Sequence, residues 1–179
     1  LIDGFSGSEY KLFINGKTVN DKGRRSKLDA EIKEVDIDEF LTLGKNDVAV
    51  RLIVNRRTDG LLDLLKIVGD FSAIEKDGKH IISKKPSEIL IGDWTKQGYP
   101  FYSGTGVYET QFNLSDEYLE DKLFINLNCG EDVAEIVVND SEPIVLSWNP
   151  YKADITNLVK SGSNTIKIKI TNTLINILE

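Results

Sequence analysis

Two groups of aromatic residues offer the clearest chemistry in this sequence. They are Trp94, Tyr99 and Tyr102, which fall within nine residues together with Phe101, and Trp148 with Tyr151, which flank an Asn-Pro pair. Aromatic faces stack on the apolar faces of sugar rings, while neighbouring Asn, Asp and Gln side chains bond the hydroxyl groups. We therefore take the two tryptophans and three tyrosines as candidate carbohydrate-binding residues. The competing interpretation is that they fill a core, because large aromatic side chains are mostly buried.

Recognisable catalytic motifs are absent from the sequence. It contains no Gly-x-Ser-x-Gly, no phosphate-cradling glycine loop and no His-Glu-x-x-His. The single histidine, His80, lies beside Ile81 in a predicted hairpin strand, and a catalytic triad or a histidine metal site would depend on it alone. We therefore assign no catalytic residue and no metal ligand.

Carboxylates are so numerous, with 29 Asp and Glu, that no pair can be chosen from the sequence. A glycosidase needs only two of them, roughly 5–10 Å apart across a cleft. The acidic clusters at 36–39 and 116–121 are typical of solvated loops and helix caps. Calcium needs six to eight oxygen ligands, and no EF-hand spacing occurs. No cofactor is expected, with structural calcium at a sandwich edge as the one alternative left open.

Charge and cysteine content exclude some partners. The net charge of −7 argues against nucleic acid, since the only dense basic cluster is Arg24, Arg25 and Lys27, which is typical of a polar loop. No apolar stretch approaches the roughly 20 residues of a membrane span. The one cysteine, Cys129, excludes an internal disulfide and is expected to be a buried small hydrophobe. These features leave the cell compartment open.

One pattern occurs twice along the chain. Residues 35–52 and 153–170 align without a gap, and an apolar run ending in Asn15 or Asn139 precedes each copy. Each copy is expected to contain a strand, a turn, a short helical turn, a glycine and a second strand. Asp36 and Asp154 are suited to cap the helical turn by accepting backbone N–H bonds. Gly44 and Gly162, which also match, then end it.

Alternation of apolar and polar residues predicts an all-β fold. Residues 165–171 alternate strictly, and residues 47–54 are their counterpart in the first copy of the repeat. Residues 107–112 and 122–127 are rich in β-branched and aromatic residues, and Asp77-Gly78 indicates a hairpin. Short strands punctuated by Gly, Asn and Pro are typical of an antiparallel β-sandwich. We expect a partial sandwich, the closing half of a jelly roll, over residues 1–85 and a complete one over 86–179. The polar, proline-containing stretch at 84–87 marks the boundary.

Several motifs resemble a galactose-binding-like β-sandwich found in glycoside hydrolases. They are Gly92-Asp93-Trp94, the stretch 98–104 containing Pro-Phe-Tyr-Ser-Gly, the strands 107–112 and 134–139, Trp148-Asn149-Pro150-Tyr151, Asp154-Ile155-Thr156 and the ending 172–176. Such domains occur in family 2 enzymes and in α-L-rhamnosidase-like enzymes of family 106, and the Pro-Phe-Tyr-Ser-Gly stretch is similar to the latter group, where Gly-Asp-Phe as at 69–71 also precedes it. The resemblance covers about residues 8–178. One departure is Asn139-Asp140, where the repeats usually read Asn-Gly.

The resemblance implies a jelly-roll module of a larger carbohydrate-active enzyme. In such enzymes the catalytic acids lie in a separate barrel domain, so the implied partners are that domain, in the same polypeptide, and a glycan. A first residue other than Met, and the absence of Met throughout, favour an excised piece of a longer chain. We expect a non-catalytic, carbohydrate-binding function. A purely structural spacer would instead bury the aromatic candidates, and a hydrolase would place two carboxylates across a cleft.

Overall fold

The protein is built from strands in two compact units. The computed structural model describes residues 1–27 and 29–173, and the chain divides into an N-terminal unit, Leu1–Asp70, and a C-terminal unit, Phe71–Glu179. The described residues contain no α-helix, only the short 3-10 turns η1 (Asp38–Phe40), η2 (Thr95–Gln97) and η3 (Asp116–Tyr118). Residues 174–176 of the motif set lie outside the described part.

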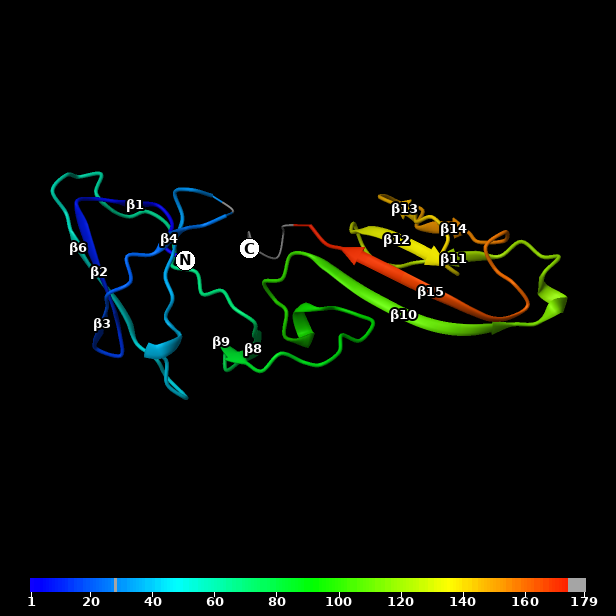
Figure 1. Ribbon diagram of the computed structural model, residues 1–179, viewed down its shortest axis with the longest axis horizontal. Coiled ribbons are helices and arrows are strands. Elements are labelled where there is room, and N and C mark those ends of the chain that lie inside the picture. Colours follow the sequence, from blue (N-terminus) through cyan, green and yellow to red (C-terminus); the bar gives the residue numbers. More distant parts are fainter. Residues whose placement is uncertain (28, 174–179) are drawn as a thin grey trace. The chain divides into compact units, whose positions relative to one another are not determined.

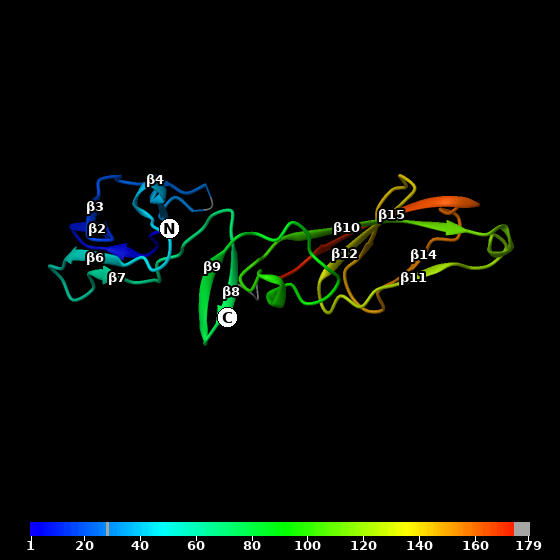
Figure 2. The same cartoon turned by 90° about the horizontal axis from the view of Figure 1, so that it is seen from below.

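The C-terminal unit is a sandwich of two antiparallel sheets. The larger sheet has the order β10 (Thr105–Leu114), β15 (Gly162–Thr171), β12 (Val133–Val138), β13 (Ile144–Leu146), and the smaller pairs β11 (Phe124–Asn126) with β14 (Lys152–Asp154). Strands β10 and β15 run side by side along the unit (Figure 1), and β11 with β14 forms a second layer (Figure 2). The predicted all-β fold of antiparallel sheets, typical of a β-sandwich, is confirmed.

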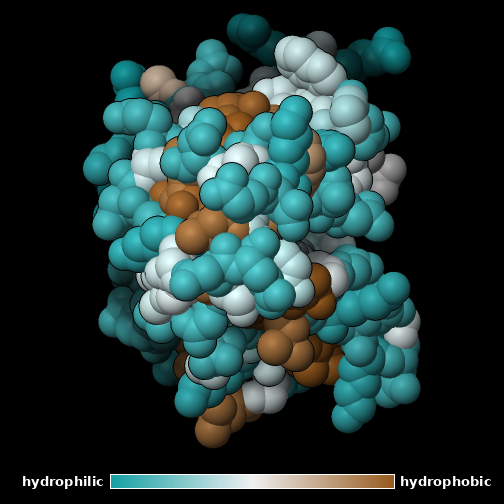
Figure 3. Space-filling view, turned by 90° about the vertical axis from the view of Figure 1, so that its right-hand side faces the viewer, coloured by the Kyte–Doolittle hydropathy of each residue, from teal (hydrophilic) through white to brown (hydrophobic). Residues whose placement is uncertain are grey.

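The sandwich core explains the alternation in the sequence. Ile136 and Val138 of β12 are fully buried against Ala153 and Ile155, and half-buried side chains such as Ile125 complete the cluster. Period-two alternation places every second residue of a strand on this face and the others outside. The outer residues include Glu135, Lys167 and Lys169 but also the exposed Val107 and Val145. The face seen in Figure 3 is mostly hydrophilic with apolar surface in separate patches.

The N-terminal unit has a smaller set of strands. A three-stranded antiparallel sheet has the order β3 (Lys17–Val19), β2 (Glu9–Ile14), β6 (Val48–Ile53). Two short pairs accompany it: β4 (Arg24–Arg25) with β5 (Lys33–Glu34), and β1 (Phe5–Ser6) with β7 (Gly60–Leu61). The core consists of Leu12, Ile14 and Val19, covered in part by residues 35–40.

In the C-terminal unit, the repeat closes on a pair of asparagines that we call the asparagine clasp. Asn139 Nδ2 donates to Asn164 Oδ1 at 2.6 Å and to the carbonyl of Leu158 at 3.0 Å. Asn164 in turn accepts from the N–H of Lys160 and donates to the carbonyls of Lys160 and Gly162. The clasp thus ties the end of β12 to the turn that precedes β15.

The N-terminal unit repeats the clasp bond for bond. Asn15 Nδ2 donates to Asn46 Oδ1 at 2.8 Å and to the carbonyl of Phe40 at 3.0 Å. Asn46 accepts from the N–H of Thr42 and donates to the carbonyls of Thr42 and Gly44. Strands β2 and β6 therefore occupy the places of β12 and β15.

The turns around the clasp agree with most of the prediction. Asp36 and Asp154 each accept the backbone N–H two residues later, at 3.1 and 3.0 Å. Gly44 and Gly162 have φ of 90° and 80°, a left-handed backbone that favours glycine. A helical turn follows only in the N-terminal unit, as η1, whereas residues 156–158 form a hydrogen-bonded turn without a helix.

The hairpin predicted around Asp77-Gly78 is present. Strands β8 (Ser72–Lys76) and β9 (Lys79–Ser83) flank these two residues, whose φ values are 53° and 70°. The hairpin belongs to the C-terminal unit, so the chain divides after Asp70 and not in the stretch 84–87. In the hairpin, the N–H of Ala73 donates to the carbonyl of Gly98 at 2.9 Å. Local composition cannot reveal this contact, because the two residues are far apart in the sequence.

Candidate functional site

A cavity of about 590 Å³ opens in the C-terminal unit beside Trp94, and we call it the Trp94 pocket. Its apolar lining comes from Trp94, Leu127 and the inner residues Ile168 and Ile170 of β15. Its polar lining comes from short acidic and amide side chains: Asp93, Asn126, Asn128, Asp132 and Asn172. An apolar wall with a few convergent polar groups is the composition of a small-molecule site, and this volume suits a mono- or disaccharide.

Trp94 is held rigidly at the wall of the pocket. Its indole Nε1 donates to the Tyr108 hydroxyl at 2.6 Å, and that hydroxyl donates to the carbonyl of Leu90. The ring lies against Gly106, where any side chain would collide with it. Trp94 also packs beside the buried cluster that includes Ile170, so its ring is half-buried and fixed in orientation.

Tyr99 and Tyr102 join Trp94 in one aromatic cluster. The ring centroids of Trp94 and Tyr102 are 6.0 Å apart and those of Tyr99 and Tyr102 5.8 Å apart, both edge to face. Tyr102 is 37% exposed. Asn172 connects this cluster to the pocket, because it lines the pocket and its amide bonds the carbonyl of Tyr102 and the N–H of Gly104. The structure therefore brings three of the five candidates together.

The other two candidates lie elsewhere and differ from each other. Trp148 is 77% exposed and contributes nothing to the pocket lining. Tyr151 is 5% exposed in a core cluster with Ala134 and Ile170, and its hydroxyl donates to the carbonyl of Asp132 at 2.7 Å. A ring enclosed in this way cannot stack on a sugar. A purely structural spacer was expected to bury all five aromatic candidates, and of the five only Tyr151 is buried.

The acidic side chains at the pocket have contrasting environments. Thr95 donates to the Asp93 carboxylate from its hydroxyl at 2.6 Å and its N–H at 2.9 Å, which lowers the pKa of Asp93. Lys96 also lies 3.3 Å from that carboxylate. Burial raises the pKa of Asp132, since few groups around it favour the charged form. The two carboxyl groups at the pocket therefore have pKa values shifted in opposite directions.

Sequence reasoning missed most of the polar lining. Asn126 and Asn128 flank Leu127 and both line the pocket. Their spacing of two, at the end of the predicted strand 122–127, is the signal that places them on one face. Asp132 and Asn172 carried no such signal, because strand pairing alone brings the starts of β12 and β10 beside the end of β15.

Other residues considered from the sequence have structural surroundings. His80 is exposed on β9, with its ring centroid 4.7 Å from that of Phe101. Arg24 forms an exposed ion pair with Glu34 at 2.8 Å. Cys129 is only half-buried at the pocket, and burial raises the pKa of its thiol, which disfavours the nucleophilic thiolate.

Residues 1–27 and 29–173 contain neither a cluster of metal-ligating side chains nor a helix suited to a membrane. No group of three or more His, Cys, Asp and Glu is placed to hold a metal ion there. No helix in that part of the chain has the length and apolarity to cross a membrane.

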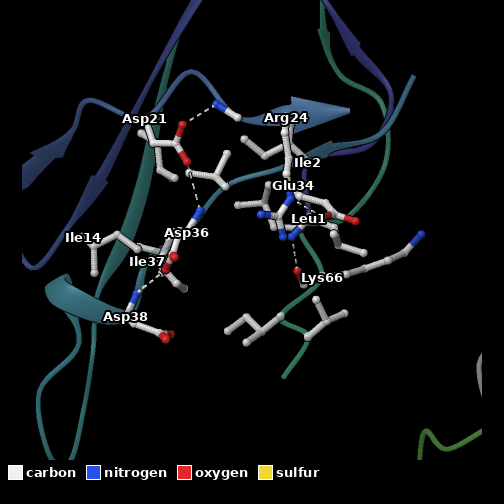
Figure 4. A pocket seen from close by; sticks show the side chains of 17 residues that line it. Leu1, Ile2, Ile14, Asp21, Arg24, Glu34, Asp36, Ile37, Asp38 and Lys66 are labelled. Carbon is white, nitrogen blue, oxygen red and sulfur yellow. Dashed lines mark hydrogen bonds and ion pairs between the residues drawn. The ribbon is translucent and has the colours of Figure 1, made fainter. Parts of the chain in front are cut away.

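A second cavity, of about 800 Å³, lies in the N-terminal unit, and we call it the N-terminal hollow. Apolar side chains of the core face it, including Ile14 and Ile37, while Asp21 and Asp36 lie together at one side (Figure 4). Asp21 accepts the N–H groups of Gly23 and Asp36, so its carboxylate supports the backbone of the loop. These contacts are structural, and the hollow presents no aromatic platform.

Comparison with known proteins relates the chain to glycoside hydrolases. No protein-family model matches it. Over 79 residues it is 34% identical to a Formosa agariphila protein named "Putative beta-glucuronidase", a stretch that is 42% of this chain and 7% of that protein. The chain thus spans a small fraction of its curated relative.

Two solved structures illustrate the structural likeness. A Ruminococcus gnavus beta-glucuronidase has 23% identity and a TM-score of 0.37, over 52% of this chain and 16% of that one. A rhamnosidase from Novosphingobium sp. PP1Y has 20% identity and a TM-score of 0.39, over 96% and 17%. The association is with glycoside hydrolases in general, and these likenesses do not single out family 106.

Proposed function

We propose that the C-terminal unit is a non-catalytic, carbohydrate-binding module of a glycoside hydrolase, and that the Trp94 pocket is its sugar site. The observation that carries the proposal is the pocket itself. It joins one rigid indole wall to five short polar side chains in about 590 Å³. The apolar wall faces the C–H groups of a sugar, and amides and carboxylates take its hydroxyl groups.

The charge of the pocket favours a neutral sugar over a uronic acid. Asp93 and Asp132 line it, and no Lys or Arg is among the described residues that do. A uronate carboxylate would lie beside the carboxyl groups of the lining, and the neighbouring Lys96 is already paired with Asp93 at 3.3 Å, whereas neutral hydroxyl groups donate to carboxylates. We further propose that the parent enzyme is α-L-rhamnosidase-like, on the resemblance of residues 98–104, and that its catalytic domain is the module's partner.

Calorimetric titration of the chain with neutral and uronate-containing oligosaccharides tests the site. The neutral panel contains rhamnose and galactose oligomers. We expect binding by the neutral panel, and Asn126→Ala and Asn128→Ala should each weaken it about tenfold, the effect of one hydrogen bond to a sugar. Both amides are exposed, so their loss should leave the fold intact. Asn113→Ala, on an exposed position of β10, is the matched control. Absence of binding by any sugar contradicts the proposal.

A structural spacer is the alternative favoured by the environment of Trp94. The indole N–H is already bonded to Tyr108 and the ring supports the core, so Trp94 stabilises the fold whether or not sugar binds. Under the spacer hypothesis the polar lining is incidental. Thermal unfolding with and without sugar separates the two, because a ligand that binds only the folded state raises Tm.

A hydrolase is a second alternative, since Asp93 and Asp132 share one cavity and their pKa values are shifted in opposite directions. Such a contrast is a feature of glycosidase carboxylate pairs. Release of nitrophenol from aryl glycosides by the chain, abolished by Asp132→Asn, would favour this function. If the unit is a binding module, neither the unsubstituted chain nor the Asp132→Asn variant releases nitrophenol.

A further inference from the structure

Strand β6 has an open edge where its counterpart in the repeat is fully paired. The asparagine clasp makes β6 equivalent to β15, through Asn46 and Asn164. Strand β15 is paired on one edge with β12 and on the other with β10, over ten residues. Strand β6 pairs with β2 on one edge, and within residues 1–27 and 29–70 no strand pairs with the other. That row of backbone groups is available for a further strand.

The N-terminal hollow lies beside this edge and is lined by the corresponding core positions. Leu12, Ile14 and Val48 face it, and they correspond to Ile136, Val138 and Ile166. In the C-terminal unit the same face is covered by packed apolar side chains, whereas Val48 is 45% exposed. Leu12 and Ile14 are themselves buried, so the hollow is a sandwich interior that is open at Val48, on the edge strand. An occupant beside β6 must offer apolar side chains on alternate positions.

Charge on the outer face of the sheet defines the occupant further. In the C-terminal unit, Lys169 of β15 lies opposite Glu135 and pairs with it at 3.3 Å. The corresponding residues in the N-terminal unit are Arg51 and Lys11, which are two like charges directly opposite each other. Like charges at such positions are unfavourable. Lys11 pairs with Glu9 at 3.6 Å, while Arg51 is exposed and has no ion pair within residues 1–27 and 29–70.

We propose that the open edge of β6 is a docking site for one extended peptide strand. The strand runs antiparallel to β6, as β10 does to β15. Its inner side chains are apolar and enter the hollow, and an acidic side chain lies opposite Arg51. Backbone bonds to the edge provide affinity, and the alternating side chains with the acidic residue provide specificity.

Peptides based on β10 test the docking site on the whole chain. By the register of β10 on β15, Val107 lies opposite Lys169 and therefore corresponds to the position opposite Arg51. We expect a capped, fluorescent peptide of residues 105–114 carrying Val107→Glu to bind in fluorescence anisotropy at least tenfold more tightly than the same peptide carrying Val107→Lys. In the Arg51→Glu variant of the chain the order should reverse. Arg51 is exposed, so this variant should fold, and its circular dichroism spectrum checks this.

Reversal of the order locates the peptide at β6, because exchange into the C-terminal sheet would not depend on Arg51. Equal binding of the two peptides to both forms of the chain, or no binding, overturns the proposal. A second copy of the chain at this edge would also overturn it. That outcome appears in sedimentation velocity as a concentration-dependent dimer that Arg51→Glu dissociates and neither peptide displaces.

Discussion

The two units carry the same asparagine clasp within different amounts of surrounding structure. In the C-terminal unit, β10 and a second sheet enclose it, and Asn164 is 1% exposed. In the N-terminal unit the equivalent Asn46 makes the same bonds but is half-buried. The repeated residues therefore encode a local turn and its hydrogen bonds. Burial, and with it most of the stability, depends on the strands packed around them.

The largest expected difference is in the two cores. Ile136→Ala should reduce the free energy of unfolding of the C-terminal unit by about 3–4 kcal/mol, since Ile136 is fully buried and a cavity remains. Leu12→Ala, at the matching position, should cost about 2 kcal/mol, because Leu12 is buried but already faces the N-terminal hollow. Urea unfolding followed by tryptophan fluorescence reports the C-terminal unit, which contains both tryptophans. Hydrogen exchange of the backbone amides reports the stability of the N-terminal unit. Equal losses would contradict the difference in packing.

The clasp itself provides the next comparison. Asn164→Ala should cost about 2–3 kcal/mol because it leaves several buried backbone groups without partners. Asn46→Ala should cost about 1 kcal/mol, since water can reach the corresponding groups. Denaturant titration of both variants measures the difference. The exposed Asn113→Ala is the control, with a change within about 0.5 kcal/mol. If Asn46→Ala reduced the free energy of unfolding by as much as Asn164→Ala, water would not reach the clasp of the N-terminal unit, which contradicts the prediction.

Within the C-terminal unit, the two neighbouring aromatic candidates should respond differently. Tyr151→Phe removes one buried hydrogen bond to the Asp132 carbonyl and should lower stability by about 1 kcal/mol. Trp148→Ala should change it by less than about 0.5 kcal/mol, because the side chain is 77% exposed. Thermal unfolding distinguishes them. If Trp148→Ala also abolished sugar binding, the binding surface would extend beyond the Trp94 pocket.

The smallest expected effect concerns the turns that begin at Asp36 and Asp154. Thr156 donates to Asp154 from both its hydroxyl and its N–H, which lowers the pKa of Asp154, whereas Asp36 receives only an N–H from Asp38. A carboxyl whose pKa falls on folding adds stability above its unfolded pKa of about 3.9 and loses it as pH falls through the folded pKa. Asp154→Asn should therefore flatten the acid side of the stability profile below about pH 4. An unchanged profile in acid titration would assign no role to this turn.

Much of the fold could be predicted from local signals. Asp77-Gly78 specified its hairpin because both residues tolerate a left-handed backbone, and strict alternation specified β15. The division of the chain could not be predicted, since it depends on the contact of Ala73 with the Gly98 loop. The candidate site was predicted in part. Spacing grouped Trp94 with Tyr99 and Tyr102, but it also grouped Trp148 with Tyr151, whose side chains have opposite exposure.

The sequence by itself determined several of the strands, the two-fold repeat, the turns that asparagine and glycine permit, and the net charge of −7. These features depend on residues close together in the chain. Only the tertiary structure decided which aromatic side chains face solvent, and that Asp132 and Asn172 share one pocket with Trp94. It also decided that β6 has an open edge. Burial and pocket lining depend on strand order in the sheets, which brings together residues far apart in sequence.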